Sequence, residues 1–102
     1  MLNARNYNVN LNSVDINLSD SNINNIPQFI FNMTKLKNID LSHNTISTLP
    51  ERIGELSKLE TLTLDKNNLY KLPSSIGKLT KLKIFSIDKT FVSGSIISKN
   101  GL

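Results

Sequence analysis

The sequence predicts an α/β solenoid, a right-handed coil in which each turn adds one short strand to a parallel sheet. Three observations predict this architecture. Apolar residues return with a period of 23 residues through the middle of the chain. Within each period, a short apolar alternation typical of a strand is followed by an Asn and then by Leu-Pro. A chain of 102 residues has room for one domain, and therefore for about four such periods.

The composition fits a folded domain and excludes several classes of function. The chain is 38% hydrophobic and 20% charged, with a formal net charge of +4. The absence of cysteine excludes disulfides and thiolate metal sites, and the single histidine, His43, excludes metal motifs that need two histidines. The longest apolar run, residues 29–31, is too short for a transmembrane helix, and the first residues lack the apolar stretch of a signal peptide. We therefore expect a cytoplasmic protein, although an exported protein whose leader has been removed would have the same composition.

Two nearly complete copies of the repeat occupy the centre of the chain. Residues 36–50 read LKNIDLSHNTISTLP, and residues 59–73 read LETLTLDKNNLYKLP. The segments that follow both contain Ile-Gly and then a Leu two residues later. A weaker copy precedes them, with Ser21 at the position of the Asn, and a fourth begins at Leu82, with Thr90 at that position.

The consensus of these copies is LxxLxLxxNxLxxLPxxIGxLxx. It resembles the 23-residue leucine-rich repeat (LRR) of intracellular Ras-group-related proteins and their bacterial relatives, over about residues 13 to 92. The resemblance implies a short parallel sheet on the concave face and short helical, 3-10 or extended segments on the convex face. A single LRR domain over residues 1–102 would consist of an N-terminal cap (1–12), three repeats (13–35, 36–58 and 59–81), and a degenerate fourth repeat with a C-terminal cap (82–102).

The apolar alternation and the Asn residues indicate how each coil closes. Ile39 and Leu41 point to the same side of a strand, and we expect them in the core. The return path should bury a further set of apolar residues: Ile46, Leu49, Ile53 and Leu56. Asn44 and Asn67 stand where the chain turns away from its strand, and we expect them to be buried and to bond backbone groups of successive coils. Hydroxyl side chains replace the amide in the first and fourth coils, whose turns should be looser.

Proline and glycine mark the outer segment of each coil. Pro50 and Pro73 fix their own φ and hold the preceding residue extended, so a short helical turn can follow each of them. Phe31 stands where the later coils have Gly54 and Gly77. The first coil is therefore expected to bend differently at that point.

Both ends of a solenoid expose core unless they are capped. Tyr7, Val9 and Leu11 alternate with Asn residues, so residues 1–12 are interpreted as a cap that contains an edge strand. Residues 91–97 no longer follow the repeat, which indicates either an irregular cap or the point at which a longer array was cut. Because no polar capping repeat is evident there, the C-terminal end is the expected surface for self-association.

The resemblance implies that ligands bind the concave face, through the outward residues of each strand and the two residues that follow. By position these are Asp15, Asn17, Ser19 and Asp20; Asn38, Asp40, Ser42 and His43; Thr61, Thr63, Asp65 and Lys66; and Ile84, Ser86, Asp88 and Lys89. The face is polar, mixed in charge and without an aromatic anchor. Four short strands about 4.8 Å apart span a few hundred Å², against about 800 Å² per partner in a stable interface. The face alone should bind weakly.

Catalysis is not expected from these residues. His43 faces outward at a strand end, and the neighbouring Ser42 diverges from it, so the two do not form a nucleophile and base. The Asp residues are few and are interrupted by Lys66 and Lys89, which disfavours a cation site. We expect no metal and no cofactor.

We interpret the chain as a non-catalytic protein-protein interaction module, either an adaptor or scaffold or the recognition part of a signalling protein. Its partner would be a protein of unknown identity, and no membrane association is expected. Two alternatives remain. One is self-assembly as a structural module, a homo-oligomer formed through the C-terminal end. The other, less favoured, is nucleic-acid binding by a cluster without an aromatic stacking platform: Lys78, Lys81, Lys83 and Lys89.

Overall fold

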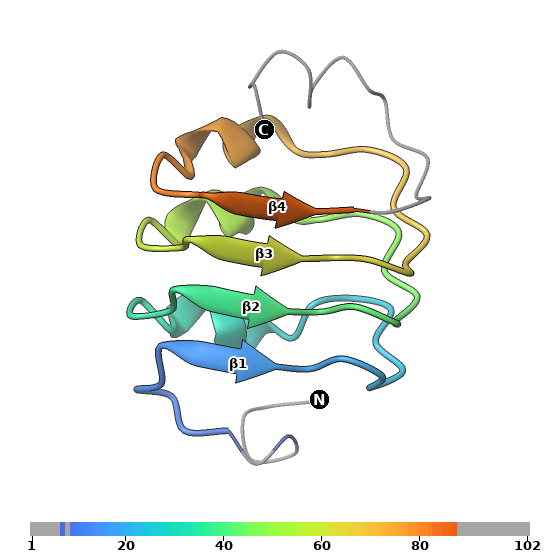
Figure 1. Ribbon diagram of the computed structural model, residues 1–102, viewed down its shortest axis with the longest axis horizontal. Helices are drawn as coiled ribbons and strands as arrows, with labels where there is room; N and C mark the ends of the chain where they lie inside the picture. The colour runs from blue at the N-terminus through green and yellow to red at the C-terminus, as the bar shows by residue number, and fades with distance from the viewer. Residues whose placement is uncertain (1–6, 8, 88–102) are drawn as a thin grey trace.

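The computed structural model describes residues 7 and 9–87 and forms four coils stacked in sequence order (Figure 1). Each coil contributes one three-residue strand: β1 (Asp15–Asn17), β2 (Asn38–Asp40), β3 (Thr61–Thr63) and β4 (Ile84–Ser86). Between successive strands lie three 3-10 helices: η2 (Gln28–Asn32), η3 (Glu51–Glu55) and η4 (Ser74–Lys78). In Figure 1 the strands form one layer and the 3-10 helices lie behind it. The predicted alternation of strands and helical turns is confirmed.

The strands form one parallel sheet in the order β1-β2-β3-β4. Equivalent residues of successive coils lie side by side, as in the row Ile16, Ile39, Leu62 and Phe85. The pairing continues past the strand ends, because the N–H of Leu18 donates to the carbonyl of Asp40 at 2.8 Å and the same bond recurs in the next two coils. Each repeat therefore advances the sheet by one strand without a shift in register.

The core lies between the sheet and the 3-10 helices. In the second coil, the apolar residues predicted to point inward are all at most 5% exposed: Ile39, Leu41, Ile46, Leu49, Ile53 and Leu56. This confirms the predicted inner face of the coil. In the fourth coil, Leu82, Phe85 and Ile87 are only half-buried. The described core is therefore most complete in the second and third coils.

Asn44 connects the first two coils from a buried position, with 7% of its surface exposed. Its Oδ1 accepts hydrogen bonds from the backbone N–H groups of Ser21 and Ile23, both at 3.0 Å. Its Nδ2 donates to the carbonyls of Leu18 at 3.0 Å and Leu41 at 2.9 Å. One amide side chain thus satisfies backbone groups that two successive turns leave unpaired.

Asn67 repeats this arrangement one coil later and is 9% exposed. It accepts from the N–H of Ile46 at 3.0 Å and donates to the carbonyls of Leu41 at 2.9 Å and Leu64 at 3.1 Å. The predicted ladder of buried Asn residues is confirmed. The next residue in the series, Thr90, lies outside the described residues.

The turn of the first coil takes a different path from the later turns. The sequence predicts a difference here, because Ser21 replaces the Asn of those turns. The Ser21 hydroxyl donates only to the nearby carbonyl of Ser19, at 3.2 Å. Two residues of this turn, Asp20 and Asn22, have positive φ (53° and 56°), whereas each later described turn has a single one. A hydroxyl is too short to span two coils, so the turn relies on local bonds.

Short helical turns follow the prolines, as predicted. Pro50 and Pro73 are extended, with ψ of 157° and 153°, and η3 and η4 begin at the next residue. The expectation that Phe31 would bend the first coil differently is wrong: η2 has the same five-residue length as η3 and η4, and the residue that follows it, Met33, has a similar φ of −88°. The side chain acts instead on spacing, because η3 packs much more closely against η4 than against η2.

The predicted edge strand of the N-terminal cap is also wrong where residues 1–12 are described. Tyr7 lies in a 3-10 turn, and residues 11 and 12 form a hydrogen-bonded turn. The Asn10 side chain accepts from the N–H of Asn12 at 2.9 Å, and its carbonyl accepts from Ser13 at 3.0 Å. Local bonding by the Asn side chain therefore overrides the alternating pattern. The irregular segment 91–97 lies outside the described residues.

Candidate functional site

The outward residues of the strands form one surface, here called the sheet face. Two rows of equivalent positions cross it. The first row is Asp15, Asn38, Thr61 and Ile84, and the second is Asn17, Asp40, Thr63 and Ser86. Alternation along each strand puts these side chains on the side opposite to the core, and all of them are exposed or half-buried. The structure therefore brings the strand residues of the predicted site together.

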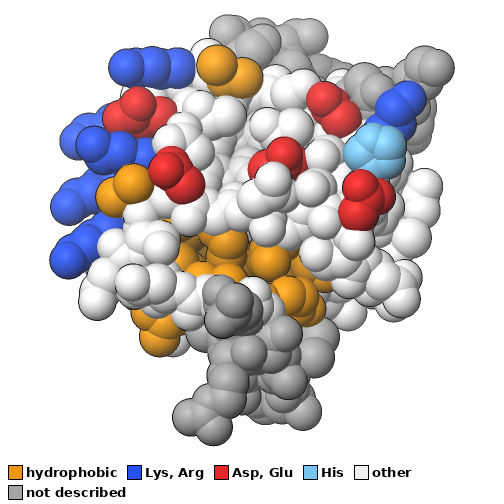
Figure 2. Space-filling model, turned by 60° about the horizontal axis from the view of Figure 1, so that its bottom comes forward, with side chains coloured by type: hydrophobic (Ala, Val, Ile, Leu, Met, Phe, Trp, Pro, Cys, Tyr) orange, Lys and Arg blue, Asp and Glu red, His pale blue; other side chains and the backbone are white. Residues whose placement is uncertain are grey.

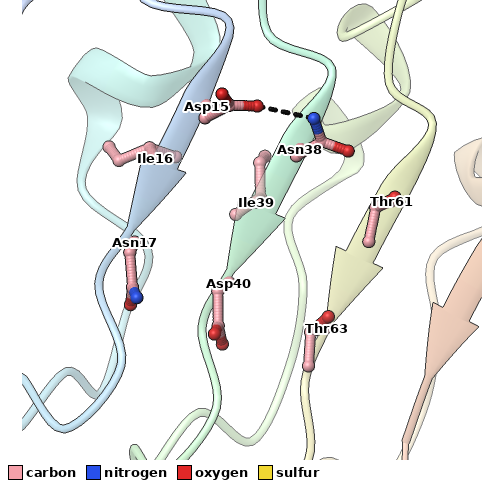
Figure 3. Close-up of a pocket in the computed structure, with 8 residues that line it drawn as sticks. All are labelled: Asp15, Ile16, Asn17, Asn38, Ile39, Asp40, Thr61 and Thr63. Atoms are coloured by element: carbon pink, nitrogen blue, oxygen red, sulfur yellow. Dashed lines mark hydrogen bonds between the residues drawn. The ribbon is translucent and has the colours of Figure 1, made fainter.

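The sheet face is hollowed over β1, β2 and β3. The hollow has a volume of about 640 Å³, and its polar lining comes mainly from Asp15, Asn17, Asn38 and Asp40 (Figure 3). Asn38 donates through Nδ2 to Asp15 Oδ1 at 2.5 Å, which joins the first two strands. Asp15 and Asp40 are the charged residues that line the hollow, so this part of the surface is acidic.

Hydrogen bonds fix the end of each of the first two strands in the same way. Asn17 Oδ1 accepts from the N–H of Ser19 at 2.9 Å and from its hydroxyl at 2.7 Å. Asp40 Oδ1 accepts from the N–H of Ser42 at 3.0 Å and from its hydroxyl at 2.7 Å. The second carboxylate oxygen of Asp40 has no donor among the described residues, so it can accept a hydrogen bond from a partner. Its geometry is set before any partner arrives.

The residues after the strands form a second strip beside the sheet face. Asp65 accepts from the Ser86 hydroxyl at 2.8 and 2.9 Å, which connects the third coil to β4. His43 Nδ1 lies 3.9 Å from Asp20 Oδ1, with both side chains largely exposed. The remaining predicted residues of this strip, Asp88 and Lys89, lie outside the described residues.

A left-handed backbone position recurs in this strip, and the sequence analysis missed it. Asp20, His43 and Lys66 occupy equivalent positions, and their φ angles are 53°, 57° and 61°. A glycine in the sequence is the usual signal for this conformation. Asp, His and Lys are weaker signals, so the sequence did not reveal it. The backbone therefore aims three charged or titratable side chains outward from the same point of each turn.

A second hollow, of about 480 Å³, lies at the edge where the chain leaves the strands, on the side opposite to the strand starts. We call this edge the descending edge. It includes Tyr70, Lys71, Thr48 and Glu51. Tyr70 is 50% exposed and is the exposed aromatic residue of the described chain. The sequence analysis considered aromatic residues on the sheet face alone, whereas the structure places the exposed Tyr70 at this edge.

Other chemistry finds little support in the geometry. The Ser42 hydroxyl donates to Asp40, whereas His43 Nδ1 lies 3.9 Å from Asp20 Oδ1, so the two neighbours face different groups. Within residues 7 and 9–87, no group of three His, Cys, Asp or Glu side chains comes together to hold a metal ion. The helices described there are also too short and too polar for a bilayer span.

Comparison with known proteins decides the family. The model of the leucine-rich repeat region matches residues 10–99, most of the chain. The chain is a leucine-rich-repeat protein. LRR domains are generally protein-interaction modules and typically carry no catalytic function, so a protein partner is the general expectation for this chain.

A solved structure extends the comparison. An LRR protein of Leptospira interrogans is 34% identical to this LRR chain and covers 70% of it, with a TM-score of 0.67. The match covers 18% of the Leptospira chain, so the present chain corresponds to a small part of that protein. No curated protein matches the LRR chain.

Proposed function

We propose that this LRR chain binds a protein partner without catalysis, through the sheet face and its edges. The observation that carries the proposal is the hollowed, preorganised sheet face, on which Asp40 presents a free carboxylate oxygen from a fixed position. A rigid acceptor loses little side-chain entropy when a donor from a partner binds to it. The fold itself, with a core behind the sheet, keeps the strands in place.

The chemistry of the sheet face favours donors. Asp15 and Asp40 line the hollow together with amide and hydroxyl side chains and with the apolar residues Ile16 and Ile39. In Figure 2 acidic side chains are spread over this face, while the lysines gather at its margins. A partner segment with lysine, arginine or backbone N–H groups would complement this surface.

The edges must add to the affinity, because the strands alone give a patch of a few hundred Å². Tyr70 at the descending edge provides an aromatic side chain of the type that often dominates interface energies. An adaptor or scaffold, or the recognition part of a signalling protein, would use the domain in this way. A cytoplasmic location is part of the same proposal.

A matched pair of variants tests the sheet face. Thr63→Lys places a long cation in the sheet face, and Thr80→Lys makes the same change on an exposed loop behind the start of β4. Immobilised wild-type and variant chains would be used to capture proteins from an extract of the source cells, with identification by mass spectrometry. We expect one protein to be captured by the wild type and by Thr80→Lys and lost with Thr63→Lys and Asp40→Lys. Capture of the same proteins by all four chains would contradict the proposal.

Self-association through the C-terminal end is the second candidate. It is favoured by Leu82, Phe85 and Ile87, which are half-buried although their equivalents in the third coil are fully buried, and by Ile84, which is 56% exposed. Size-exclusion chromatography with light scattering tests it. A mass that rises with concentration, and that falls again in Ile84→Lys, supports self-association. A monomer at every concentration contradicts it.

A further inference from the structure

A row of lysines runs along the edge of the solenoid at which the chain approaches each strand. Lys35, Lys58 and Lys81 are one repeat apart, and each is exposed in the loop between a 3-10 helix and the next strand. Because the coils stack in register, the three residues lie one above the other. In Figure 2 basic side chains gather along the left margin of the molecule, with acidic side chains beside them.

A second row lies next to the first, directly before the strands. It contains Lys37, Glu60 and Lys83, and Lys83 Nζ lies 3.8 Å from Glu60 Oε1. We call the five lysines of the two rows the basic edge: Lys35, Lys37, Lys58, Lys81 and Lys83. With Glu60 included, this edge carries a net charge of +4, equal to the formal charge of the whole chain. Outside the edge, the charges of the chain balance.

The basic edge is available for a partner. Among the described residues, no ion pair engages Lys35, Lys37, Lys58 or Lys81, and Lys83 has one half-buried carboxylate partner, Glu60. Exposed lysines that repel one another favour an anionic ligand, and Glu60 is the one carboxylate among the five lysines of this edge. The sheet face, which carries the proposed function, is acidic in its hollow and lies on a different surface.

The spacing of the row indicates the form of the anion. Successive strands of a sheet are about 4.8 Å apart, so the three lysines repeat at about that distance along the solenoid. Side chains three or four residues apart on one face of an α-helix repeat at about 5–6 Å. On an extended strand, side chains of one face repeat at about 6.6–6.8 Å, and the mismatch grows with each coil. A helix follows the row more closely.

We propose that the basic edge binds an acidic helix of a partner protein, laid along the solenoid axis. Asp or Glu residues at i, i+4 and i+8 of that helix meet Lys35, Lys58 and Lys81 in turn. Lys37 and Lys83 flank the helix on the side of the sheet. This interaction goes beyond the proposed function, because it uses a separate surface and adds a second contact to a partner that the sheet face holds.

Titration of the full chain with two synthetic peptides tests the proposal. The probe is an alanine-based helix with Glu at every fourth residue over three turns, and the comparison peptide has the same composition with Glu at every second residue. Binding is followed at low salt by NMR shifts of the 15N-labelled chain. We expect the first peptide to bind at least about fivefold more tightly, with shifts around Lys35, Lys58 and Lys81, and to be released as salt rises.

Two variants with the same charge change locate the site. Lys58→Glu lies in the centre of the row, and Lys71→Glu is an exposed lysine at the descending edge. We expect Lys58→Glu to weaken binding of the helical peptide about tenfold and Lys71→Glu less than twofold. Asp40→Asn should leave peptide binding unchanged, which separates this proposal from the function of the sheet face.

Several results would overturn the proposal. One is an equal loss of binding in the two lysine variants, and another is equal binding of the two peptides. A third is tighter binding of single-stranded RNA or of phosphatidylserine vesicles than of the helical peptide, with the same dependence on Lys58. That result would assign the edge to phosphate groups in place of an acidic helix.

Discussion

The junction between η3 and η4 differs from the junction between η2 and η3, although the repeat is the same. At the inner junction, Gly54 lies against Ser75, and a Cβ built on the glycine would stand 2.8 Å from the Ser75 Cβ. At the first junction, Phe31 replaces the glycine and the guanidinium of Arg52 replaces the serine, with 5.2 Å between the Arg52 Cζ and the ring centre. The first junction is wider because two large side chains fill it. The size of the side chain that fits at one position of the repeat thus depends on the residue that it meets in the next coil.

The strand side shows no such difference. Asn44 and Asn67 make equivalent bonds at the two junctions. The bonding of the Asn ladder is therefore uniform on the sheet side, while the spacing of the 3-10 helices is adjustable. Substitutions at both sides can separate these two behaviours.

The largest effect is expected at the Asn ladder. Asn44→Ala leaves the N–H groups of Ser21 and Ile23 and the carbonyl of Leu18 without partners, which should lower the free energy of unfolding by about 3–6 kcal/mol. Asn67→Ala should have a similar effect. Urea denaturation followed by circular dichroism measures both. The exposed Asn68→Ala is the control, with a change within about 0.5 kcal/mol. Unequal losses at Asn44 and Asn67 would break the uniformity of the strand side.

The core is expected to respond next, and differently in the inner and outer coils. Leu62 is fully buried, so Leu62→Ala should lower the free energy of unfolding by about 2–5 kcal/mol. Phe85 pairs with it in β4 but is half-buried, so Phe85→Ala should have a smaller effect although a larger side chain is lost. Thermal unfolding of both variants tests this order. A greater loss for Phe85→Ala would mean that the fourth coil is packed as well as the third.

Glycine variants probe the inner junction directly. Gly54→Ala places a methyl group against the Ser75 side chain and its carbonyl, and the overpacking should lower stability by about 1–3 kcal/mol. Gly77→Ala has no atom within 4 Å of the new Cβ and should be neutral or raise stability by about 0.5 kcal/mol. The difference between their midpoints in urea is the measurement. Equal effects would show that η3 and η4 can move apart freely.

The smallest effect is expected at the first junction. Arg52→Ala removes the contact with the Phe31 ring and the bonds to Gln28 and Asn32, at 3.1 and 3.4 Å. The polar bonds are exposed and the ring contact involves one face of the buried Phe31, so the loss should be about 1 kcal/mol. Arg52→Met would retain part of the packing over the ring and should recover part of the stability. A thermal midpoint unchanged in Arg52→Ala would mean that Phe31 alone fills this junction.

Much of the fold follows from the sequence because the repeat encodes contacts to identical neighbours. The burial of Leu41, the ladder of Asn44 and Asn67, and the helical turns after Pro50 and Pro73 were all predicted from one period. The sequence misled where a residue meets a different neighbour. Phe31 appeared to demand a bend because its partner Arg52 was not considered, and the residues after Tyr7 alternated like a strand although Asn10 closes a turn.

The candidate site was predictable in position but less so in shape. Alternation along the strand placed Asp40 and Thr63 on the sheet face, because the neighbouring Ile39 and Leu62 point into the core. The positive φ at His43 was not predictable, because a histidine adopts that conformation far less often than a glycine does. The role of these residues in binding stays a prediction.

The bonds of Asn44 also set rules for recombining the repeats. By sequence this residue belongs to residues 36–58, but its Oδ1 serves the preceding coil. Consider a chimaera in which a copy of residues 13–35 is inserted between the second and third coils. Ser21 would then stand where an Asn side chain must accept hydrogen bonds from the backbone N–H groups of the preceding coil, and those N–H groups would have no acceptor. Modules of this protein are therefore interchangeable only if the incoming turn brings its own Asn, so the sensible place to splice lies after a turn and before the next proline.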